Sequence, residues 1–358
     1  MSGYRGGVIG CGFFAQRHLH AWREIEQASI VAVCDLDAER ARAASQLMGG
    51  IPFFTSASEM LDRVTVDFVD IVTTMQSHLA LVQLTAKRGL PTIVQKPIAP
   101  DWRSALAIVV EAEKYGIPLM VHENFRFQPA MRRTKDIIAA GEIGIAEWAQ
   151  ISFRSDFDFY ASQPYLRNQK DLILLEVGVH LTDLARFFIG DAVSIYGIGQ
   201  QVGGTVIGED QATLLIKHER GRVSIIDMSF ESHRQRTAFA DMTAVIEGDR
   251  GSILVEASGG LTIRSDGKTR HEHPPARAAS WGQDFPTASH SVHSACRHFI
   301  ETLSAGTEPE TSGADNLKSF ALVVAGYQSM RTGRRMLPPR RPVQRPARVM
   351  RVAVPDPS

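Results

Sequence analysis

The chain has 358 residues, of which 44% are hydrophobic and 22% are charged, and its 39 basic and 39 acidic side chains give a formal net charge of zero. This length suits two domains of a soluble globular protein, and a neutral chain has no overall charge to attract nucleic acid, an anionic membrane or an acidic partner. No apolar run approaches the roughly 20 residues that a membrane span needs, and residues 1–5 do not resemble a signal peptide. We therefore expect a cytoplasmic protein.

The three cysteines, Cys11, Cys34 and Cys296, are widely spaced, and no metal-ligand spacing joins them. Their odd number does not suggest a disulfide framework. We expect buried free thiols in a reducing compartment, and we expect no bound metal.

The first 121 residues alternate short apolar runs with patterns of helical periodicity. The runs that predict strands cover residues 6–9, 30–34, 68–72, 92–94 and 119–121. The helical patterns between them cover residues 14–25, 38–48, 77–88 and 102–115. Such alternation predicts an α/β fold with a parallel sheet and right-handed crossovers, so we expect a Rossmann domain over residues 1–121.

The pattern changes after residue 121, where strand-like runs separated by turn signals become the main feature. These runs cover residues 148–153, 193–198, 212–217, 223–229, 243–247, 252–255 and 261–264. Helical patterns cover residues 130–140, 177–188, 291–304 and 315–330. We expect an α+β domain over residues 122–337, with a large, mostly antiparallel open sheet and helices on one face. Residues 338–358 form a Pro/Arg-rich tail, which we interpret as solvated, although a docking role stays open.

A glycine-rich hexapeptide, Gly10-Cys11-Gly12-Phe13-Phe14-Ala15, follows the first predicted strand and begins a helix. It fits the G-x-G-x-x-G/A pattern of dinucleotide-binding loops. In that pattern the first glycine allows a tight turn, the second lets the backbone approach a pyrophosphate, and the small third residue allows close helix packing. The start of the helix offers free N–H groups to phosphate oxygens.

Asp35 stands at the end of the second predicted strand, where an acid is expected to accept hydrogen bonds from the adenosine ribose hydroxyls. A carboxylate there would repel a 2′-phosphate, so the sequence predicts NAD rather than NADP. Asp37 is better explained as the N-cap of the next helix. The alternative is a Rossmann-like domain that binds no dinucleotide.

Gln95-Lys96-Pro97 follows the fourth predicted strand, and the carboxyl ends of strands in an open parallel sheet face the ligand crevice. A lysine at this position is suited to take or give the proton of a substrate hydroxyl. A solvated loop lysine is an equally good interpretation from position alone.

Glu176 and His180 are four residues apart, so on a helix they share one face, with Gly178 between them leaving space for a ligand. A histidine beside a carboxylate is a common acid/base pair. A metal site is the weaker alternative because no third ligand has suitable spacing, and an incidental histidine on an N-capped helix is another.

His122, Asn124 and Arg126 follow the fifth predicted strand at the junction of the two domains. His122 and Asn124 are the better candidates for contacts near the cofactor, whereas Arg126 is suited to hold the domains together.

Basic residues near these elements leave the charge of the substrate open. If two or more of them lined the crevice, an acidic substrate would be favoured; we favour the alternative, in which they face solvent or the domain interface. These residues are Arg126, Arg154, Arg167 and Lys170. Tyr165 belongs to a loop, with Phe157 and Tyr160, that is placed to close over a sugar.

Together these features resemble the glucose–fructose oxidoreductase, inositol dehydrogenase and rhizopine-catabolism (Gfo/Idh/MocA) family, over residues 6 to about 337. The matching segments are Gly10 to Ala15, Asp35, Thr73 with His78, Gln95 to Pro97, Asn124 to Pro129, Glu176 to His180 with Asp183, and Glu247 to Gly251. The resemblance implies oxidation of a sugar or polyol hydroxyl by hydride transfer to NAD, and a homodimer or homotetramer built on the antiparallel sheet.

The resemblance also implies roles for individual residues. The catalytic residues would be Lys96, His180 and Glu176. The cofactor contacts would be Gly10, Gly12, Phe13, Phe14, Asp35, Thr73, His78, Gln95, Lys96 and Asn124. The substrate contacts would be Lys96, His122, Arg154, Tyr165, Glu176 and His180.

Three positions depart from the family pattern. Gln95 replaces a glutamate, Glu176 replaces an aspartate, and Thr74 replaces a proline. None of these changes removes a proton-transfer group.

Within the family, the segments around Gly10–Trp22, Gln95–Pro97 and His122–Gln128 are similar to a clade that includes D-apiose dehydrogenases, which implies oxidation of a furanose aldose at C1. Two other classes stay open: a hydrolase that uses NAD transiently to cleave a glycoside, and a non-catalytic NAD-dependent sensor. The presence of Lys96, Glu176 and His180 argues against the sensor.

Overall fold

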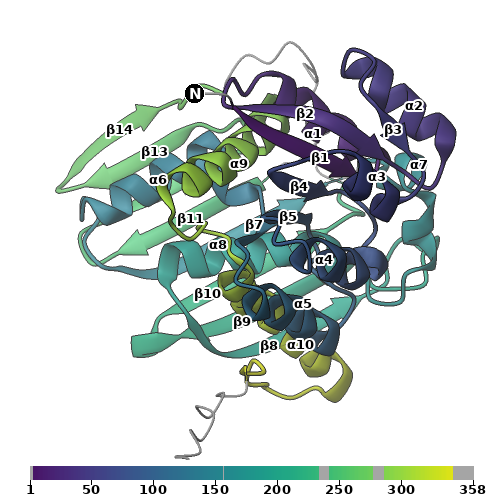
Figure 1. Cartoon of the computed structure of the whole chain (residues 1–358). Coiled ribbons are helices and arrows are strands. Elements are labelled where there is room, and N and C mark those ends of the chain that lie inside the picture. Colours follow the sequence, from purple (N-terminus) through teal and green to yellow (C-terminus); the bar gives the residue numbers. More distant parts are fainter. Residues whose placement is uncertain (1–2, 156, 234–241, 277–285, 342–358) are drawn as a thin grey trace, which may run out of the picture.

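A computed structural model of the chain describes residues 3–155, 157–233, 242–276 and 286–341. Two sheets form its frame (Figure 1). None of the helices in the described ranges has the length and apolarity of a transmembrane segment. Most of the predicted Pro/Arg-rich tail, residues 342–358, lies outside the described residues.

The first sheet has six strands in the order β3-β2-β1-β4-β5-β6, and all of its neighbouring pairs are parallel. Its strands are β1 (Tyr4–Ile9), β2 (Ala28–Cys34), β3 (Phe53–Phe54), β4 (Phe68–Ile71), β5 (Thr92–Gln95) and β6 (Leu119–His122). This is the strand order of a Rossmann domain, and the predicted α/β fold is confirmed. The two-residue β3 was missed because it is too short to form a pattern.

The crossovers of this sheet are helical. The helices are α1 (Ala15–Arg23), α2 (Ala38–Leu47), α3 (Ala57–Arg63), α4 (His78–Ala86) and α5 (Trp102–Lys114). Asp37 accepts hydrogen bonds from the backbone N–H groups of Glu39 and Arg40, so its predicted role as the N-cap of α2 is confirmed. Helix α3 was not predicted.

The second sheet has eight strands in the order β14-β13-β12-β11-β7-β10-β9-β8. They are β7 (Ala146–Arg154), β8 (Ala192–Gln200), β9 (Gln211–His218), β10 (Val223–Ser229), β11 (Met242–Gly248), β12 (Gly251–Val255), β13 (Leu261–Ser265) and β14 (Lys268–Glu272). Every neighbouring pair is antiparallel except β7 and β10, which confirms the mostly antiparallel sheet. Strand β14 was not predicted.

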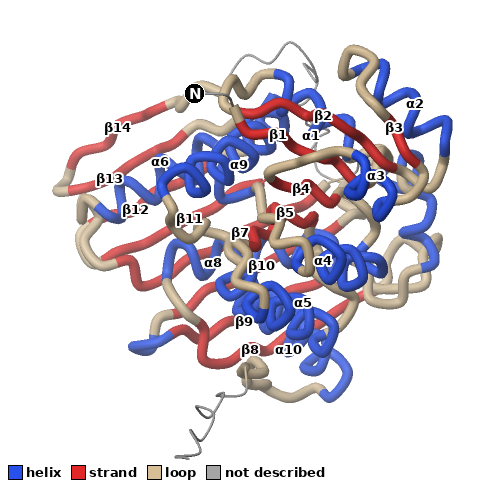
Figure 2. The backbone as a smooth tube through the Cα atoms, viewed as in Figure 1, coloured by secondary structure: helices blue, strands red, loops and turns tan. Residues whose placement is uncertain are grey.

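Helices cover one face of the second sheet. Helix α8 (Val179–Ile189) packs on β7 and β10, and α10 (Gly313–Thr332) packs on β8 and on α8. Helices α10 and α5 also lie side by side, which joins the two domains (Figure 2). The opposite face of the sheet carries exposed side chains, among them Tyr196 and Leu215, which are paired across β8 and β9.

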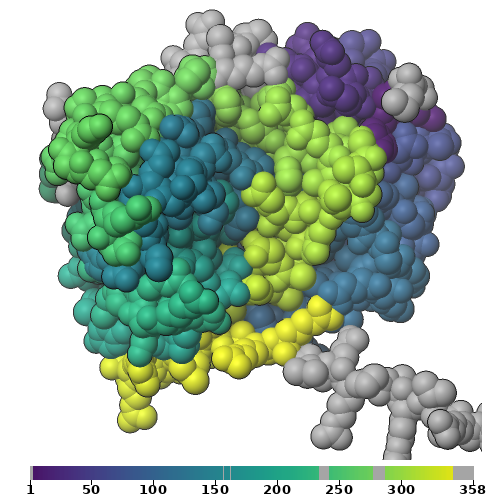
Figure 3. Space-filling model, turned by 90° about the vertical axis from the view of Figure 1, so that its left-hand side faces the viewer, coloured from purple at the N-terminus to yellow at the C-terminus, as the bar shows by residue number. Residues whose placement is uncertain are grey.

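Helix α9 (Pro286–Ala305) corrects one expectation. It was expected to cover the antiparallel sheet, but it packs against α1 and beside β6 of the Rossmann domain. Its buried residues Val292, Cys296 and Phe299 belong to the same apolar cluster as Trp22 and Phe68. In Figure 3 this helix, in lime green, lies beside the purple and blue N-terminal residues.

The other helical segments connect these elements. They are α6 (Pro129–Ala139), α7 (Phe159–Ser162), a π-helical turn at Leu174–Gly178 and short 3₁₀ turns at Met75–Ser77, Phe125–Phe127, Pro164–Asn168 and Glu219–Gly221. The π-helical turn directly precedes α8 and carries Glu176, so the predicted helix over 177–188 is more loosely wound at its start.

Candidate active site and cofactor site

A cavity of about 220 Å³ is formed where strand ends of the first sheet meet elements of the second domain. From the first domain it is lined by Phe14 before α1, Thr73 after β4 and Lys96 after β5. From the second it is lined by Glu176 and His180. The carboxyl ends of parallel strands are the usual position of a ligand in such a sheet, and this cavity contains polar groups from both domains.

The glycine loop has the geometry that a dinucleotide needs. Gly10 has a φ of +98°, and a Cβ atom there would lie 2.4 Å from the carbonyl oxygen of Val72, so only glycine fits. A Cβ atom on Gly12 would meet no atom within 4 Å, which leaves the backbone open to a ligand. Helix α1 has no side-chain cap and no acidic residue in its first turn, so its N–H groups are available to a phosphate.

Asp35 lies at the end of β2, as predicted, and also fixes the glycine loop. Its carboxylate accepts hydrogen bonds from the backbone N–H of Cys11 at 2.7 Å and of Asp37 at 2.9 Å. Each carboxylate oxygen can accept further bonds, so Asp35 can still accept ribose hydroxyls. Burial and the nearby Asp35 charge raise the pKa of Cys11 to about 12, which makes this thiol a poor nucleophile.

Two predicted cofactor contacts after β4 differ in accessibility. Thr73 lines the cavity, and its hydroxyl is 2.7 Å from that of Ser77. His78 is fully buried, and its ring nitrogens bind the carbonyl oxygens of Ile98 and Thr73 at 3.0 and 3.1 Å. The expectation that His78 touches the cofactor is therefore corrected: it holds the loop that carries Thr73.

Lys96 meets Glu176 across the domain junction. The ammonium nitrogen donates a hydrogen bond to the backbone carbonyl of Glu176 at 2.8 Å and lies 3.6 Å from its carboxylate. Both side chains are mostly buried, with 15% and 13% exposed. Gln169 donates a further hydrogen bond to the Glu176 carboxylate at 3.2 Å. The lysine is thus held at the cavity wall, which excludes the solvated-loop interpretation.

His180 is paired with Glu123, not with Glu176 as we expected. Its Nδ1 atom is hydrogen-bonded to the Glu123 carboxylate, and its ring stacks on Phe125 at 3.8 Å with an interplanar angle of 3°. Burial and the nearby Lys96 ammonium lower the pKa of His180 well below its ordinary value. Glu176 and His180 do share the cavity, but each has its own partner, because the π-helical turn separates Glu176 from the regular helix.

Glu123 is the site residue that sequence reasoning missed. It directly follows β6 in the segment that supplied His122 and Asn124, and it is fully buried. Burial raises its pKa to about 7, against the opposing effect of the positive charges on Lys96 and Arg126. An acidic residue immediately after a buried strand was the available signal.

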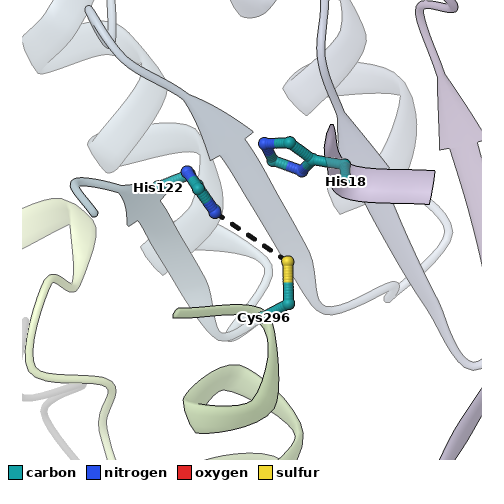
Figure 4. A group of neighbouring side chains, drawn as sticks. All are labelled: His18, His122 and Cys296. Atoms are coloured by element: carbon teal, nitrogen blue, oxygen red, sulfur yellow. Dashed lines mark hydrogen bonds between the residues drawn. The ribbon is translucent and has the colours of Figure 1, made fainter. Parts of the chain in front are cut away.

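His122 does not reach the cavity, which corrects its assignment as a substrate contact. It is fully buried with His18 of α1 and Cys296 of α9, and its Nε2 atom is 3.8 Å from the Cys296 sulfur (Figure 4). Adjacent residues of an extended strand point to opposite sides, so His122 faces the helices while Glu123 faces α8. Potential ligand atoms of these three residues lie within 4.8 Å of one another.

Each residue of this buried group has a hydrogen-bond partner. His18 Nδ1 binds Asp70 at 2.8 Å, and Trp22 donates to the same carboxylate at 2.7 Å. His122 and Cys296 are partners of each other. The described residues offer three donor atoms here, whereas a structural zinc site has four.

Arg154 is also corrected. It is the last residue of β7 and binds Asp227 at 2.7 Å and Gln211 at 3.1 Å on the outer face of the sheet. The preceding residue, Phe153, points the other way and lines the cavity. Polar Gln150 and Ser152 share the face of Arg154, and apolar Ala149 and Ile151 share the face of Phe153, so the alternation along β7 indicates which neighbour faces the site.

The remaining predicted contacts lie at the cavity. Its lining includes Phe13, Phe14, Gln95, Asn124 and Tyr165. Asn124 donates a hydrogen bond to Ser291 of α9 at 2.7 Å, and Tyr165 donates to Gln163 at 2.9 Å. The buried side-chain amide oxygen of Gln95, Oε1, has no hydrogen-bond partner among the described residues, which leaves it available to a ligand.

Arg126 has the structural position that we expected. It is 5% exposed and forms a two-pronged pair with Asp183 at 2.8 and 2.5 Å, and it also contacts Asp315 at 3.1 Å. This arrangement neutralises a buried guanidinium and ties the end of β6 to α8 and α10.

Comparison with known proteins gives a consistent result over both domains. Residues 4–123 match the model of an oxidoreductase family with an NAD-binding Rossmann fold, and residues 131–254 match the Gfo/Idh/MocA C-terminal domain. A D-apiose dehydrogenase from Paraburkholderia graminis is 42% identical, over 92% of this chain and 88% of that protein. A D-apiose dehydrogenase from Rhizobium rhizogenes is 38% identical, over 93% of this chain and 97% of that protein.

Among solved structures, an oxidoreductase from Agrobacterium radiobacter in complex with NAD⁺, L-tartaric acid and magnesium superposes with a TM-score of 0.91. The two chains are 37% identical, over 93% of this chain and 98% of that one.

Proposed function

Because this chain belongs to the Gfo/Idh/MocA family of NAD-binding oxidoreductases, we propose that it oxidises a neutral sugar at a hydroxyl-bearing carbon, with a small furanose aldose such as D-apiose as substrate. The reaction would convert the C1 carbinol of the aldose to a lactone. The observation that carries this proposal is the convergence of Lys96, Glu176 and His180 on a cavity that begins at the glycine loop.

The geometry of the chain fits NAD, which would accept the hydride when bound. Gly12 and the start of α1 would hold the pyrophosphate, and Asp35 would accept the ribose hydroxyls. Thr73, Gln95 and Asn124 line the part of the cavity that leads from this loop toward Lys96.

The substrate hydroxyl would be bound and deprotonated by three residues, Lys96, His180 and Glu176. The Lys96 ammonium donates a hydrogen bond to the hydroxyl oxygen, and Glu176 holds the lysine through its carbonyl and carboxylate oxygens. His180 shares the proton transfer with Lys96 through its Nε2 atom, because Nδ1 is occupied by Glu123. General acid–base groups of this kind contribute about 10²- to 10⁴-fold to a rate.

The lining of the cavity is mostly uncharged, with Arg17, Lys96 and Glu176 as its charged side chains, and this favours a neutral sugar over an acidic one. Five aromatic side chains of the second domain contribute to its lining: Phe153, Phe157, Phe159, Tyr165 and Phe230. Two of the basic residues considered above do not line the cavity and have other partners. Arg154 pairs with Asp227, and Arg167 stacks on Tyr160 at 4.7 Å. Aromatic rings suit the C–H face of a furanose, which has no charge to neutralise.

We infer that the enzyme works as a homo-oligomer in the cytoplasm. The outer face of the second sheet exposes apolar side chains, among them Tyr196, Ile198 and Leu215, which a second copy of the same sheet would cover. The three cysteines are free, as a reducing compartment would maintain them.

The test is a screen of NAD reduction with D-apiose, other aldoses, polyols and aldonates. The expected result is steady, stoichiometric NADH formation with D-apiose or a related furanose, and weaker activity with aldonates. Cleavage of a glycoside without net NADH would refute the dehydrogenase and support the transient-oxidation hydrolase.

A further inference from the structure

Behind His180 lies a buried acid that the proposed reaction does not yet use. Glu123 is fully buried at the end of β6, and one of its carboxylate oxygens is hydrogen-bonded to His180 Nδ1. Its second oxygen, Oε2, is buried and has no hydrogen-bond partner among the described residues. A buried carboxylate oxygen without a partner is costly, so its presence next to the cavity calls for an explanation.

The surroundings fix the histidine in one orientation. The ring is stacked on Phe125 at 3.8 Å, which prevents it from turning out of its plane. Its hydrogen bond with the described residues is at Nδ1, so the free nitrogen, Nε2, is left for the cavity that His180 lines. The stack and the hydrogen bond therefore present one particular nitrogen to a ligand.

Several charged groups face this pair. Lys96 acts on both members from the end of β5, Arg126 acts on Glu123 from the turn after β6, and Asp183 and Glu176 act on His180 from α8 and the π-helical turn. Arg126 is already neutralised by Asp183 and Asp315. Among the described residues, the hydrogen bond of the Glu123 side chain is to the imidazole, whereas Lys96 and Arg126 act on it through their charge.

We propose that Glu123 is a positioning residue that binds the Nδ1 proton of His180 and so keeps the Nε2 lone pair directed at the substrate. This inference rests on the proposed dehydrogenase function. As the substrate is oxidised, its C–H bond would supply a hydride to NAD⁺, and its O–H bond would release a proton that forms a bond with Nε2. The Glu123 carboxylate would then stabilise the imidazolium that results.

Replacing the carboxylate by an amide separates this role from simple packing. The side-chain NH₂ group of Glu123→Gln can donate to Nδ1, which would leave the proton on Nε2, the wrong nitrogen. In a serine protease, the equivalent change of the triad aspartate to asparagine lowers kcat by about 10⁴ through the same effect. We expect kcat of Glu123→Gln to fall at least 10²-fold, with KM within a few-fold of wild type and partial recovery in Glu123→Asp.

A matched control is available in the same chain. Asp70 and His18 form another fully buried carboxylate–histidine pair, 2.8 Å apart, away from the cavity lining. Asp70→Asn should lower the melting temperature yet leave kcat near wild type. An equal loss of kcat in Asp70→Asn and Glu123→Gln at matched stability would overturn the proposal.

The histidine tautomer gives a readout that does not depend on turnover. In ¹⁵N NMR spectra recorded at pH 8, above the pKa of about 7 of Glu123, the His180 signals can be assigned by comparison with His180→Asn. There wild type should carry its proton on Nδ1 and Glu123→Gln on Nε2. A wild-type proton on Nε2, or an unchanged tautomer and pH–rate profile in Glu123→Gln, would refute the role of Glu123. If no sugar reduces NAD, the proposed function fails, whereas the tautomer experiment still decides the role of Glu123.

Discussion

The Lys96 ammonium nitrogen lies 2.8 Å from the carbonyl oxygen of Glu176, a residue 80 positions later in the sequence. This single contact joins the end of a strand in the cofactor domain to the first helical turn beneath the antiparallel sheet. Lys96, the proposed proton-transfer group, is therefore positioned by both domains at once, and a change in their relative placement would move it.

Lys96→Ala should lower kcat by at least 10²-fold, because it removes the proposed proton-transfer group and the partner of Glu176. Lys135→Ala is a matched control, since Lys135 also donates to a backbone carbonyl, that of Phe187, but lies outside the cavity lining. Steady-state kinetics with the best substrate of the screen, together with binding of NADH, would measure both. Similar losses in both variants would contradict the role of Lys96.

Asp35→Ser should reduce the preference for NAD over NADP by about tenfold or more. The change removes the repulsion of a 2′-phosphate and weakens the bonds to the ribose hydroxyls, and each hydrogen bond to a charged group contributes about 1.5–3 kcal/mol. The ratio of kcat/KM for the two cofactors measures the effect. Asp37→Ser is the control, because serine preserves the cap of α2. An equal change of the kcat/KM ratio in Asp37→Ser would show that the effect comes from altering the loop and not from the Asp35 carboxylate.

Glu123→Gln should change how stability depends on pH. The pKa of Glu123 is raised by burial to about 7, above roughly 4.3 for an unfolded chain. The folded protein therefore holds a proton that the unfolded chain has lost, and this stabilisation is complete below about pH 4.3 and disappears as the pH rises through 7.

Urea unfolding at pH 5 and pH 8 would measure this pH dependence of the free energy of unfolding. Between the two, wild type should lose up to about 3 kcal/mol of its free energy of unfolding relative to Glu123→Gln. A difference between the two proteins that does not vary with pH would contradict the buried state of this carboxyl.

Prolonged dialysis against a chelator should leave kcat and the melting temperature unchanged. The buried group of His18, His122 and Cys296 offers three donor atoms in the described ranges, and two of these residues are hydrogen-bonded to each other. Metal analysis of the purified protein provides the measurement. One equivalent of zinc, lost together with stability on chelation, would show that a fourth ligand completes the site.

Leu215→Glu should dissociate the assembly by placing a charge on the exposed apolar face of the second sheet, where Leu215 is 49% exposed and paired with Tyr196. Light scattering coupled to size-exclusion chromatography would report the change in mass. Ile207→Glu is the control, since Ile207 is 57% exposed but lies outside the sheet. Equal masses for wild type and Leu215→Glu would show that this face is not the interface.

Much of the cofactor domain was predictable because its strands and helices alternate at regular spacing. That spacing located Gly10, Asp35 and Lys96 at strand ends, where the topology itself brings side chains to one edge. The choice between His122 and Glu123 was not predictable, whereas the polar and apolar alternation along β7 does favour Phe153 over Arg154 as the residue that faces the site. Strand β6 is buried on both faces and has no polar alternation, so its sequence does not show which of the two residues at its end faces the site.

The partner of His180 was missed for a related reason. Helical spacing connects residues that are close in sequence, and it favoured Glu176, whereas the observed partner is supplied by a strand end 57 residues earlier. Contacts of this length depend on how the domains pack, as does the placement of α9 against α1. Local periodicity carries no information about the His180–Glu123 contact or about the packing of α9 on α1.

The position of α9 means that the cofactor domain is discontinuous in the chain. Trp22 and Phe68 form an apolar cluster with Val292 and Phe299 of that helix. A fragment ending at residue 121 would therefore expose the apolar surface that α9 covers. During synthesis the strands of the N-terminal sheet are made first, and about 180 more residues are added before α9, which packs on that sheet's helix α1, is complete. A separately expressed cofactor domain would need residues 286–305 supplied on a linker or as a second chain.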